Sequence, residues 1–127
     1  MGTDLTLSVA AKNAAVDAVV DLCDAGAGAA VLSIMTAGDT ILSEHTMTDP
    51  AFGASAAGVA TAAAIGDDAS ANATGEAALF KIEDSDSNEV MRGSVGTSGE
   101  VINLNSTAIV SGTTVSITAL TVTLPDP

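Results

Sequence analysis

The sequence predicts a mainly β protein, a β-sandwich or jelly-roll-like fold with one N-terminal α-helix. Seven or eight short segments alternate apolar and polar residues, and turns rich in Gly, Pro, Asp and Ser separate them at regular intervals. Such spacing is typical of sandwiches and jelly rolls. Only residues 9–24 have helical periodicity instead. The longest run of strand-forming residues, 113–124, changes face part of the way along.

Residues 9–24 are predicted to form the helix, after a short polar segment, residues 1–8, that is expected to be an arm or an edge strand. Apolar residues recur at helical spacing on one side, and aspartates share the opposite face. The apolar positions are Val9, Val16, Val20 and Cys23, and the acidic positions are Asp17, Asp21 and Asp24. Ser8 is suited to cap the start of the helix, and Gly26 is suited to end it.

The strands that follow are inferred from period-2 alternation between turn signals. They are predicted at residues 29–36, 40–48, 58–65, 74–83, 89–95 and 100–106. Phe52 lies in a Gly/Ala-rich loop, and we expect its ring to enter the core. In strand 74–83, Phe80 and Ile82 should point inward. Strand 58–65 has small residues on both faces, which permits close approach by another sheet or another subunit.

The final segment, 113–124, is expected to serve both layers of the sandwich. Val115 and Ile117 alternate with polar residues, and then the phase slips by one, so that Leu120 and Val122 are apolar. A one-residue slip moves side chains to the other face. A bulge or a crossing between sheets is therefore predicted near residues 119–120.

Composition limits the range of functions. The 127 residues are enough for a single domain, expected to span 9–127. Sixteen acidic residues against three basic ones give a net charge of −13, which argues against nucleic-acid or anionic-membrane partners and favours a basic protein surface or divalent cations. No signal peptide or membrane span is predicted. Apolar residues are mostly Ala and Val, so the small core favours a homo-oligomer, in which subunit contacts add buried area.

Few residues suggest chemistry. Asp84, Asp86 and Asn88 begin like a calcium-binding loop, but Gly and Glu are missing from the later positions that an EF-hand requires. An ordinary acidic turn is the favoured interpretation. His45, the single histidine, is expected to be a solvated or partly buried strand residue. Cys23 lies among acids that disfavour a thiolate. We therefore expect no enzymatic activity and no cofactor.

From the helix onward the chain resembles a family of small structural proteins of tailed bacteriophages and prophages. The segments that carry the resemblance are Asp49-Pro-Ala-Phe-Gly53, Gly58-Val-Ala-Thr61, residues 67–75, Gly93-Ser-Val-Gly-Thr-Ser-Gly99, and Asn103-Leu-Asn105 through Leu124-Pro125. The resemblance covers roughly residues 10–125. Family members usually carry more aromatic residues; Phe80 matches one of these positions, whereas the strand after the first turn has none.

The resemblance implies a non-enzymatic virion component, made in the host cytoplasm. The leading expectation is a capsid decoration (cement) protein, an oligomer and most favourably a trimer, bound to the major capsid protein. The arm and strand 58–65 are the candidate contact surfaces. The alternatives are a tail- or fibre-associated structural protein and, third, a host-surface binding module. Carbohydrate binding by such a module usually needs an aromatic platform, and the chain has only two Phe and no Trp or Tyr.

Overall fold

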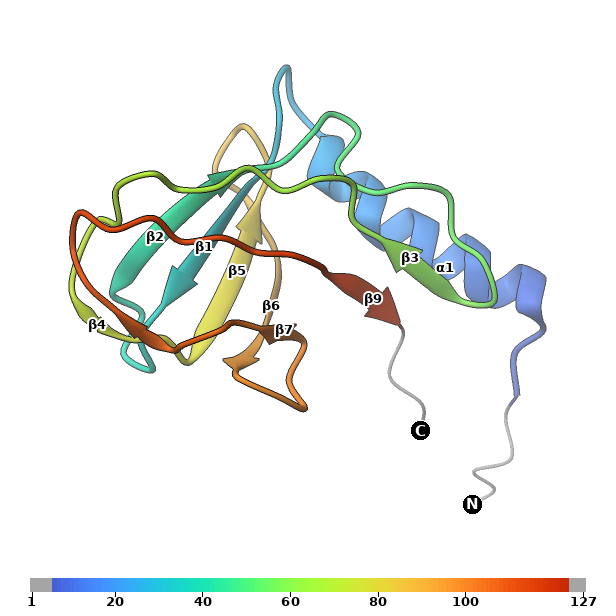
Figure 1. Ribbon diagram of the computed structural model, residues 1–127. Helices are drawn as coiled ribbons and strands as arrows, with labels where there is room; N and C mark the ends of the chain where they lie inside the picture. Colours follow the sequence, from blue (N-terminus) through green and yellow to red (C-terminus); the bar gives the residue numbers. More distant parts are fainter. Residues whose placement is uncertain (1–5, 124–127) are drawn as a thin grey trace.

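The computed structural model describes residues 6–123 and confirms a mainly β fold with one N-terminal helix (Figure 1). A curled five-stranded sheet faces a second β layer in a sandwich-like arrangement. The helical elements are α1 (Val9–Asp21) and a 3₁₀ turn, η1 (Leu22–Asp24). The strands are β1 (Val31–Met35), β2 (Ile41–Thr46), β3 (Val59–Thr61), β4 (Gly75–Glu76), β5 (Leu79–Glu83), β6 (Glu89–Gly96), β7 (Ile102–Asn103), β8 (Ala108–Ile109) and β9 (Thr121–Thr123).

The main sheet has the strand order β2-β1-β5-β6-β7. Its first four strands are antiparallel, and in the β1–β5 pair Leu32 lies opposite Ile82 and Ile34 opposite Phe80. These side chains share the inner face because side chains alternate along a strand, and all four are buried. β7 pairs with β6 in parallel, over only two residues at the end of β6. Most of the outer edge of β6 is therefore not covered by β7.

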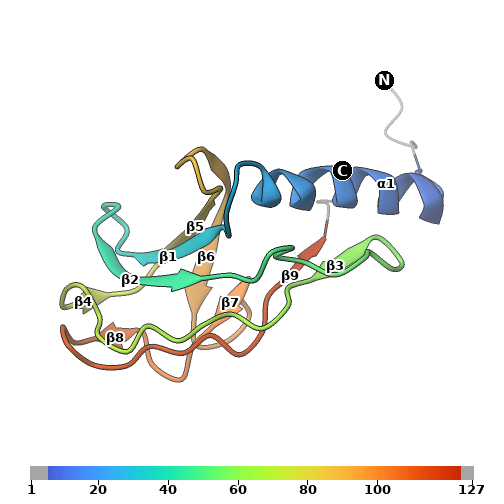
Figure 2. The ribbon, with the colours of Figure 1, turned by 90° about the horizontal axis from the view of Figure 1, so that it is seen from above.

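The second layer is an antiparallel ribbon of two long segments, residues 59–77 and 107–123. β3 pairs with β9 at one end of the ribbon, and β4 pairs with β8 at the other. Between these ends, backbone hydrogen bonds join Ala62 to Leu120, Asp68 to Val115 and Ala71 to Thr113. The two segments run side by side along the ribbon in both views (Figures 1 and 2).

The ribbon also approaches the free edge of β2, so the main sheet curls round into the second layer. The N–H of Gly66 donates to the carbonyl of Thr46 at 3.1 Å, and the N–H of Asn72 donates to the carbonyl of Leu42 at 2.7 Å. The apolar core lies between the layers. Its buried members include Leu32, Ile34, Leu42, Phe52, Phe80, Ile82, Ile102, Ile109, Val115, Ile117 and Leu120.

α1 packs on the end of the ribbon where β3 pairs with β9 (Figure 2). Its start is capped as predicted, since the Ser8 hydroxyl accepts from the N–H of Ala11 at 3.1 Å. Its apolar side buries Val16 and Val20. Beyond η1 the chain turns at Gly26, whose φ of 88° is one that glycine adopts without strain.

The polar side of this helical segment holds the loop at residues 51–58 through backbone amides. The pairs are Asn13 with Gly58 at 2.8 Å, Asp17 with Ser55 at 3.1 Å, and Asp24 with Ala51 at 2.8 Å. In each pair a side-chain oxygen accepts from a backbone N–H. Of the three aspartates predicted to share one face, two are therefore half-buried partners of the loop, and only Asp21 is exposed.

The predicted strands at 29–36, 40–48 and 89–95 are present, but others are shorter than expected. Residues 58–65 contribute only β3, residues 74–83 are divided into β4 and β5, and 100–106 contribute only β7. The arm at residues 1–8 falls mostly outside the described part of the chain.

The final segment, 113–124, was expected to be the longest strand, yet within the described residues only β9 is regular. The reason is its partner. Between β3 and the bridge from Asp68 to Val115, the N–H groups of Ala63 and Gly66 in the opposite segment donate to the carbonyls of Ala51 and Thr46, which lie outside the ribbon, so no regular ladder forms there. The predicted slip in the alternation is present, because Val115, Ile117 and Leu120 are buried while residues 118–119 between them are exposed. The expectation that this segment serves both layers is wrong for its described part, which pairs only with the opposite segment of the ribbon.

Candidate functional site

The clearest candidate site is an open seam between two strand edges, the outer edge of β6 and the outer edge of β9. On β6, the N–H of Val95 bonds to the carbonyl of Ala78 at 2.9 Å. Hydrogen-bonding direction alternates along an antiparallel pair, so the N–H groups of Arg92 and Ser94 point away from β5. On that side β7 pairs only with Val95 and Gly96, so among the described residues no strand lies opposite Arg92.

The same alternation applies to β9. Ala62 donates to the carbonyl of Leu120 at 2.9 Å, so the bonded pairs continue through Val122, and the backbone groups of Thr121 and Thr123 face away from β3. Within residues 6–123, no second strand pairs with this edge. Two strand edges with free backbone groups therefore border the same gap.

The gap is a groove of about 710 Å³. Its apolar lining is Val19, Phe80, Met91, Val101 and Val122. Its polar lining is Arg92, Ser94, Glu100, Thr121 and Thr123, with Gly99 between them. Val101 is 46% exposed, so part of its apolar surface is open to an added chain. The groove thus combines an apolar floor with hydrogen-bonding edges, which is the chemistry of a strand-binding site.

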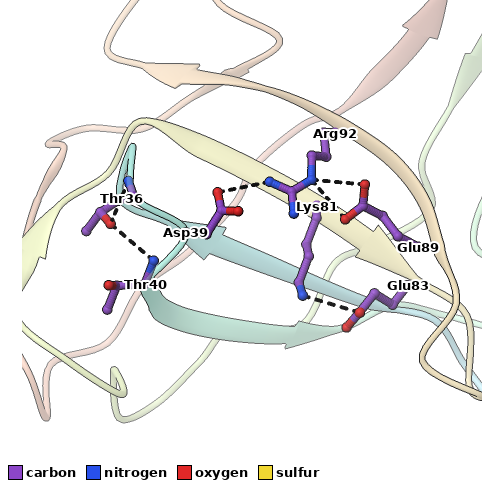
Figure 3. Close-up of polar contacts among 8 residues, drawn as sticks. Thr36, Asp39, Thr40, Lys81, Glu83, Glu89 and Arg92 are labelled. Carbon is purple, nitrogen blue, oxygen red and sulfur yellow. Dashed lines mark hydrogen bonds and ion pairs between the residues drawn. The ribbon is translucent and has the colours of Figure 1, made fainter.

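Two ion-pair groups lie on the outer face of the sheet beside the seam (Figure 3). Arg92 donates from Nη1 to Asp39 at 2.9 Å and from Nε to Glu89 at 2.8 Å. These hydrogen bonds, Asp39 first, raise the pKa of the guanidinium. Lys81 pairs with Glu83 at 3.2 Å. Arg92 is therefore neutralised by this chain's own acids, and the groove is not a strongly charged anion site.

The predicted acidic turn is present at residues 84–88, and it is closed by its own hydrogen bonds. The Asp84 carboxylate accepts from the N–H of Asp86 at 2.9 Å, the N–H of Asn88 at 2.9 Å and the Nδ2 of Asn88 at 3.2 Å. The backbone bond from Asn88, followed by those from its side chain and from Asp86, lowers the pKa of Asp84 despite its burial. The geometry brings Asp84 and Asn88 together as a turn. Across residues 6–123, no group of three or more His, Cys, Asp or Glu side chains could hold a metal ion.

His45 was expected to be solvated or partly buried, and this prediction is wrong, because the residue is fully buried. Its Nδ1 lies 2.8 Å from the carbonyl oxygen of Gly66, and its Nε2 lies 2.9 Å from the Ser43 hydroxyl. Since a carbonyl can only accept, Nδ1 carries the proton. The sequence was not used to predict this serine–histidine pair. Its spacing, Ser-x-His, could have indicated it, because residues two apart in a strand lie on the same face. Ser43 is also fully buried, so no substrate can reach the pair.

Cys23 is buried as expected. Burial, followed by the charges of Asp24 and Asp84, raises the pKa of its thiol to about 11. The thiolate is the reactive form, and it is scarce at neutral pH. A second hollow, of about 230 Å³, lies between residues 104–109 and 113–116, and its lining contains no acidic or basic side chain.

No protein family, curated protein or solved structure matches this chain. No helix among the described residues is long and apolar enough to cross a membrane.

Proposed function

We propose that this protein is a non-enzymatic structural component of a tailed-phage virion, and most favourably a capsid decoration protein. The observation that carries the proposal is the seam. It offers free strand edges over an apolar groove, and a surface of that kind joins polypeptide chains rather than transforming a small molecule. The resemblance of the chain to phage structural proteins suggests that the chains it joins belong to a virion.

The side chains with potential reactivity are buried or hydrogen-bonded within the chain, which supports a structural role. The Ser43–His45 pair is closed inside the core, the Cys23 thiol is buried, and Asp84 is occupied by its own turn. A decoration protein needs no such group to be accessible. It acts through many weak contacts, which a repeating shell multiplies into firm attachment.

The alternative role, a host-surface binding module, is disfavoured by the positions of the two aromatic residues. Phe52 and Phe80 are the only aromatic side chains in the sequence, and both are buried in the core. Neither offers an exposed ring on which a sugar could stack. The tail-associated role involves the same kind of joining surface, so the experiment must separate head from tail.

The experiment uses shells that lack this protein, with purified protein added back. Wild-type protein should bind to saturation, raise the temperature at which the shells release DNA, and appear by cryo-electron microscopy between capsomers. Val101→Asp places a charge in the seam and should weaken this protection. Val110→Asp is the matched control, because Val110 is similarly exposed, at 54%, but does not line the groove. Binding along the tail with none on the shell would overturn the decoration role.

A further inference from the structure

We propose that the seam is filled by the N-terminal arm of a second copy of this chain, with residues 3–7 added as a strand between β6 and β9. The inference rests on the proposed joining role of the seam and names the chain that occupies it. An added strand would bond to the free N–H groups of β6 on one side and to the edge of β9 on the other; addition of a strand to an exposed sheet edge is a recurring mode of peptide recognition.

The position of the arm favours a second copy. Val19 in α1 borders the groove, whereas the arm precedes Val9, at the opposite end of the helix. Ten residues of helix separate these positions by about 15 Å. The N-terminal end of α1 projects away from the main sheet in both views (Figures 1 and 2). To enter its own groove, the arm would have to fold back along the helix, whereas a neighbouring molecule can receive it directly.

The sequence of the arm matches the groove. Leu5 and Leu7 are separated by Thr6, so in an extended strand both leucines face the same way. They would cover the apolar floor formed by Met91, Val101 and Val122. Leu7, at 45% exposed, and Val101, at 46%, are both large apolar side chains left facing solvent in the single chain.

The charge of the arm is compatible with its insertion between two acidic molecules. The chain carries 16 acidic residues, but residues 1–8 contain only one of them, Asp4. Insertion of the arm therefore brings little of the negative charge that would otherwise keep two copies apart. The groove itself has one basic and one acidic residue, Arg92 and Glu100. The arm therefore adds only one acidic residue to a groove whose own charges are balanced.

The test measures the mass of the purified full chain by analytical ultracentrifugation over a range of concentrations. We expect a reversible oligomer. Leu5→Asp combined with Leu7→Asp should weaken association about a hundredfold, because two apolar contacts are lost, whereas Thr6→Asp should have little effect. Val101→Asp should weaken association similarly, and Val110→Asp should not. Circular dichroism and thermal unfolding of each variant check that it is folded.

A second measurement identifies the occupant directly. A peptide of residues 2–8 is added to the chain that begins at Ser8, and backbone amide shifts are followed by NMR. Binding should move the amides of Arg92, Ser94, Thr121 and Thr123, and a scrambled peptide should not. A full chain that is monomeric, or an oligomer unaffected by the arm variants, would overturn the inference. If the protein is monomeric but still decorates shells, the proposed function is supported and the arm inference is wrong. If it forms oligomers that depend on the arm but bind no shell, the arm inference is supported and the decoration role is wrong.

Discussion

His45 is held on both sides of its ring, by Gly66 from the ribbon and by Ser43 from its own strand. A buried polar group is tolerated only when its hydrogen bonds are made. In this site they are all made: among the described side chains, no buried nitrogen or oxygen lacks a partner. The pair therefore fixes the position of the ribbon against β2, and its contribution is to stability.

His45→Leu should lower the free energy of unfolding by about 2 kcal/mol or more, because the Gly66 carbonyl and the Ser43 hydroxyl both lose a partner. Ser43→Ala should cost less, about 1 kcal/mol, since only one ring nitrogen is left unsatisfied. Urea unfolding followed by circular dichroism measures both changes. Thr46→Val, an exposed site on the same strand, is the control and should stay within about 0.5 kcal/mol of wild type. An unchanged midpoint for His45→Leu would show that the pair does not fix the ribbon.

The lowered pKa of Asp84 predicts that the protein becomes less stable as the pH falls. Its folded-state pKa is lowered from 3.8, first by the backbone bond from Asn88, so the unfolded chain takes up the proton more readily. The stabilisation is complete above the unfolded value and is lost as the pH falls through the lower folded value. As the pH falls below about 5, the free energy of unfolding of Asp84→Asn should therefore decrease less than that of wild type. Urea unfolding at several pH values measures both decreases. Parallel curves for the two proteins would contradict this.

Individual residues were predictable where one strong preference decided their place. Phe52 and Phe80 are buried, as expected for large apolar side chains. Ser8 caps α1, because its hydroxyl can accept a hydrogen bond from the first turn of the helix. His45 was not predictable in this way. Its burial depends on the Gly66 carbonyl, 21 residues away, and sequence periodicity does not report such a partner.

At the level of elements, α1 depends on polar contacts as much as on its apolar side. Only Val16 and Val20 are buried along its length. The side chains of Asn13 and Asp17 satisfy backbone amides of the loop at 51–58, which would otherwise lack a partner within the protein. The loop and the helix thus hold each other on the end of the ribbon.

Asp17→Ala should destabilise the protein by about 1–2 kcal/mol, because the Ser55 amide loses its charged acceptor. Asp21→Ala, one turn along the same helix, removes the same charge from an exposed side chain and should change stability by no more than about 0.5 kcal/mol. Chemical denaturation gives both values, and hydrogen exchange at Ser55 gives a local measure. Equal effects of the two substitutions would mean that charge, rather than the hydrogen bond, decides the outcome.

Element boundaries followed the sequence best in strands that pair with a regular neighbour over several residues. β1, β2 and β6 were predicted within a few residues, because they belong to the antiparallel part of the main sheet. The segment at 113–124 has equally strong alternation, yet most of its described part is irregular, since N–H groups of the opposite segment at Ala63 and Gly66 bond outside the ribbon. The seam was not predictable, because it is defined by which strand edges are left without a partner, and that depends on strand order.

For the molecule as a whole, the dominant feature is its charge. The net charge is −13, and two of the three basic residues, Lys81 and Arg92, are already paired with acids. Exposed ion pairs contribute little to stability, so repulsion among the remaining acids should outweigh them. The same repulsion opposes the association of copies, which makes a joining surface of low charge, such as the seam, valuable to this protein.

Salt should therefore stabilise this protein. Between about 10 mM and 500 mM NaCl the screening length falls from about 30 Å to a few ångströms, so the repulsion is largely removed and Tm should rise by about 4 °C or more. The measurement is differential scanning calorimetry at one fixed protein concentration, because association would also raise Tm. A variant with Asp21→Lys and Asp67→Lys, both at exposed positions, carries a smaller net negative charge. Its Tm at low salt should be higher than that of wild type and its salt dependence smaller. A Tm that falls with added salt would show instead that the ion pairs of Arg92 and Lys81 outweigh the repulsion.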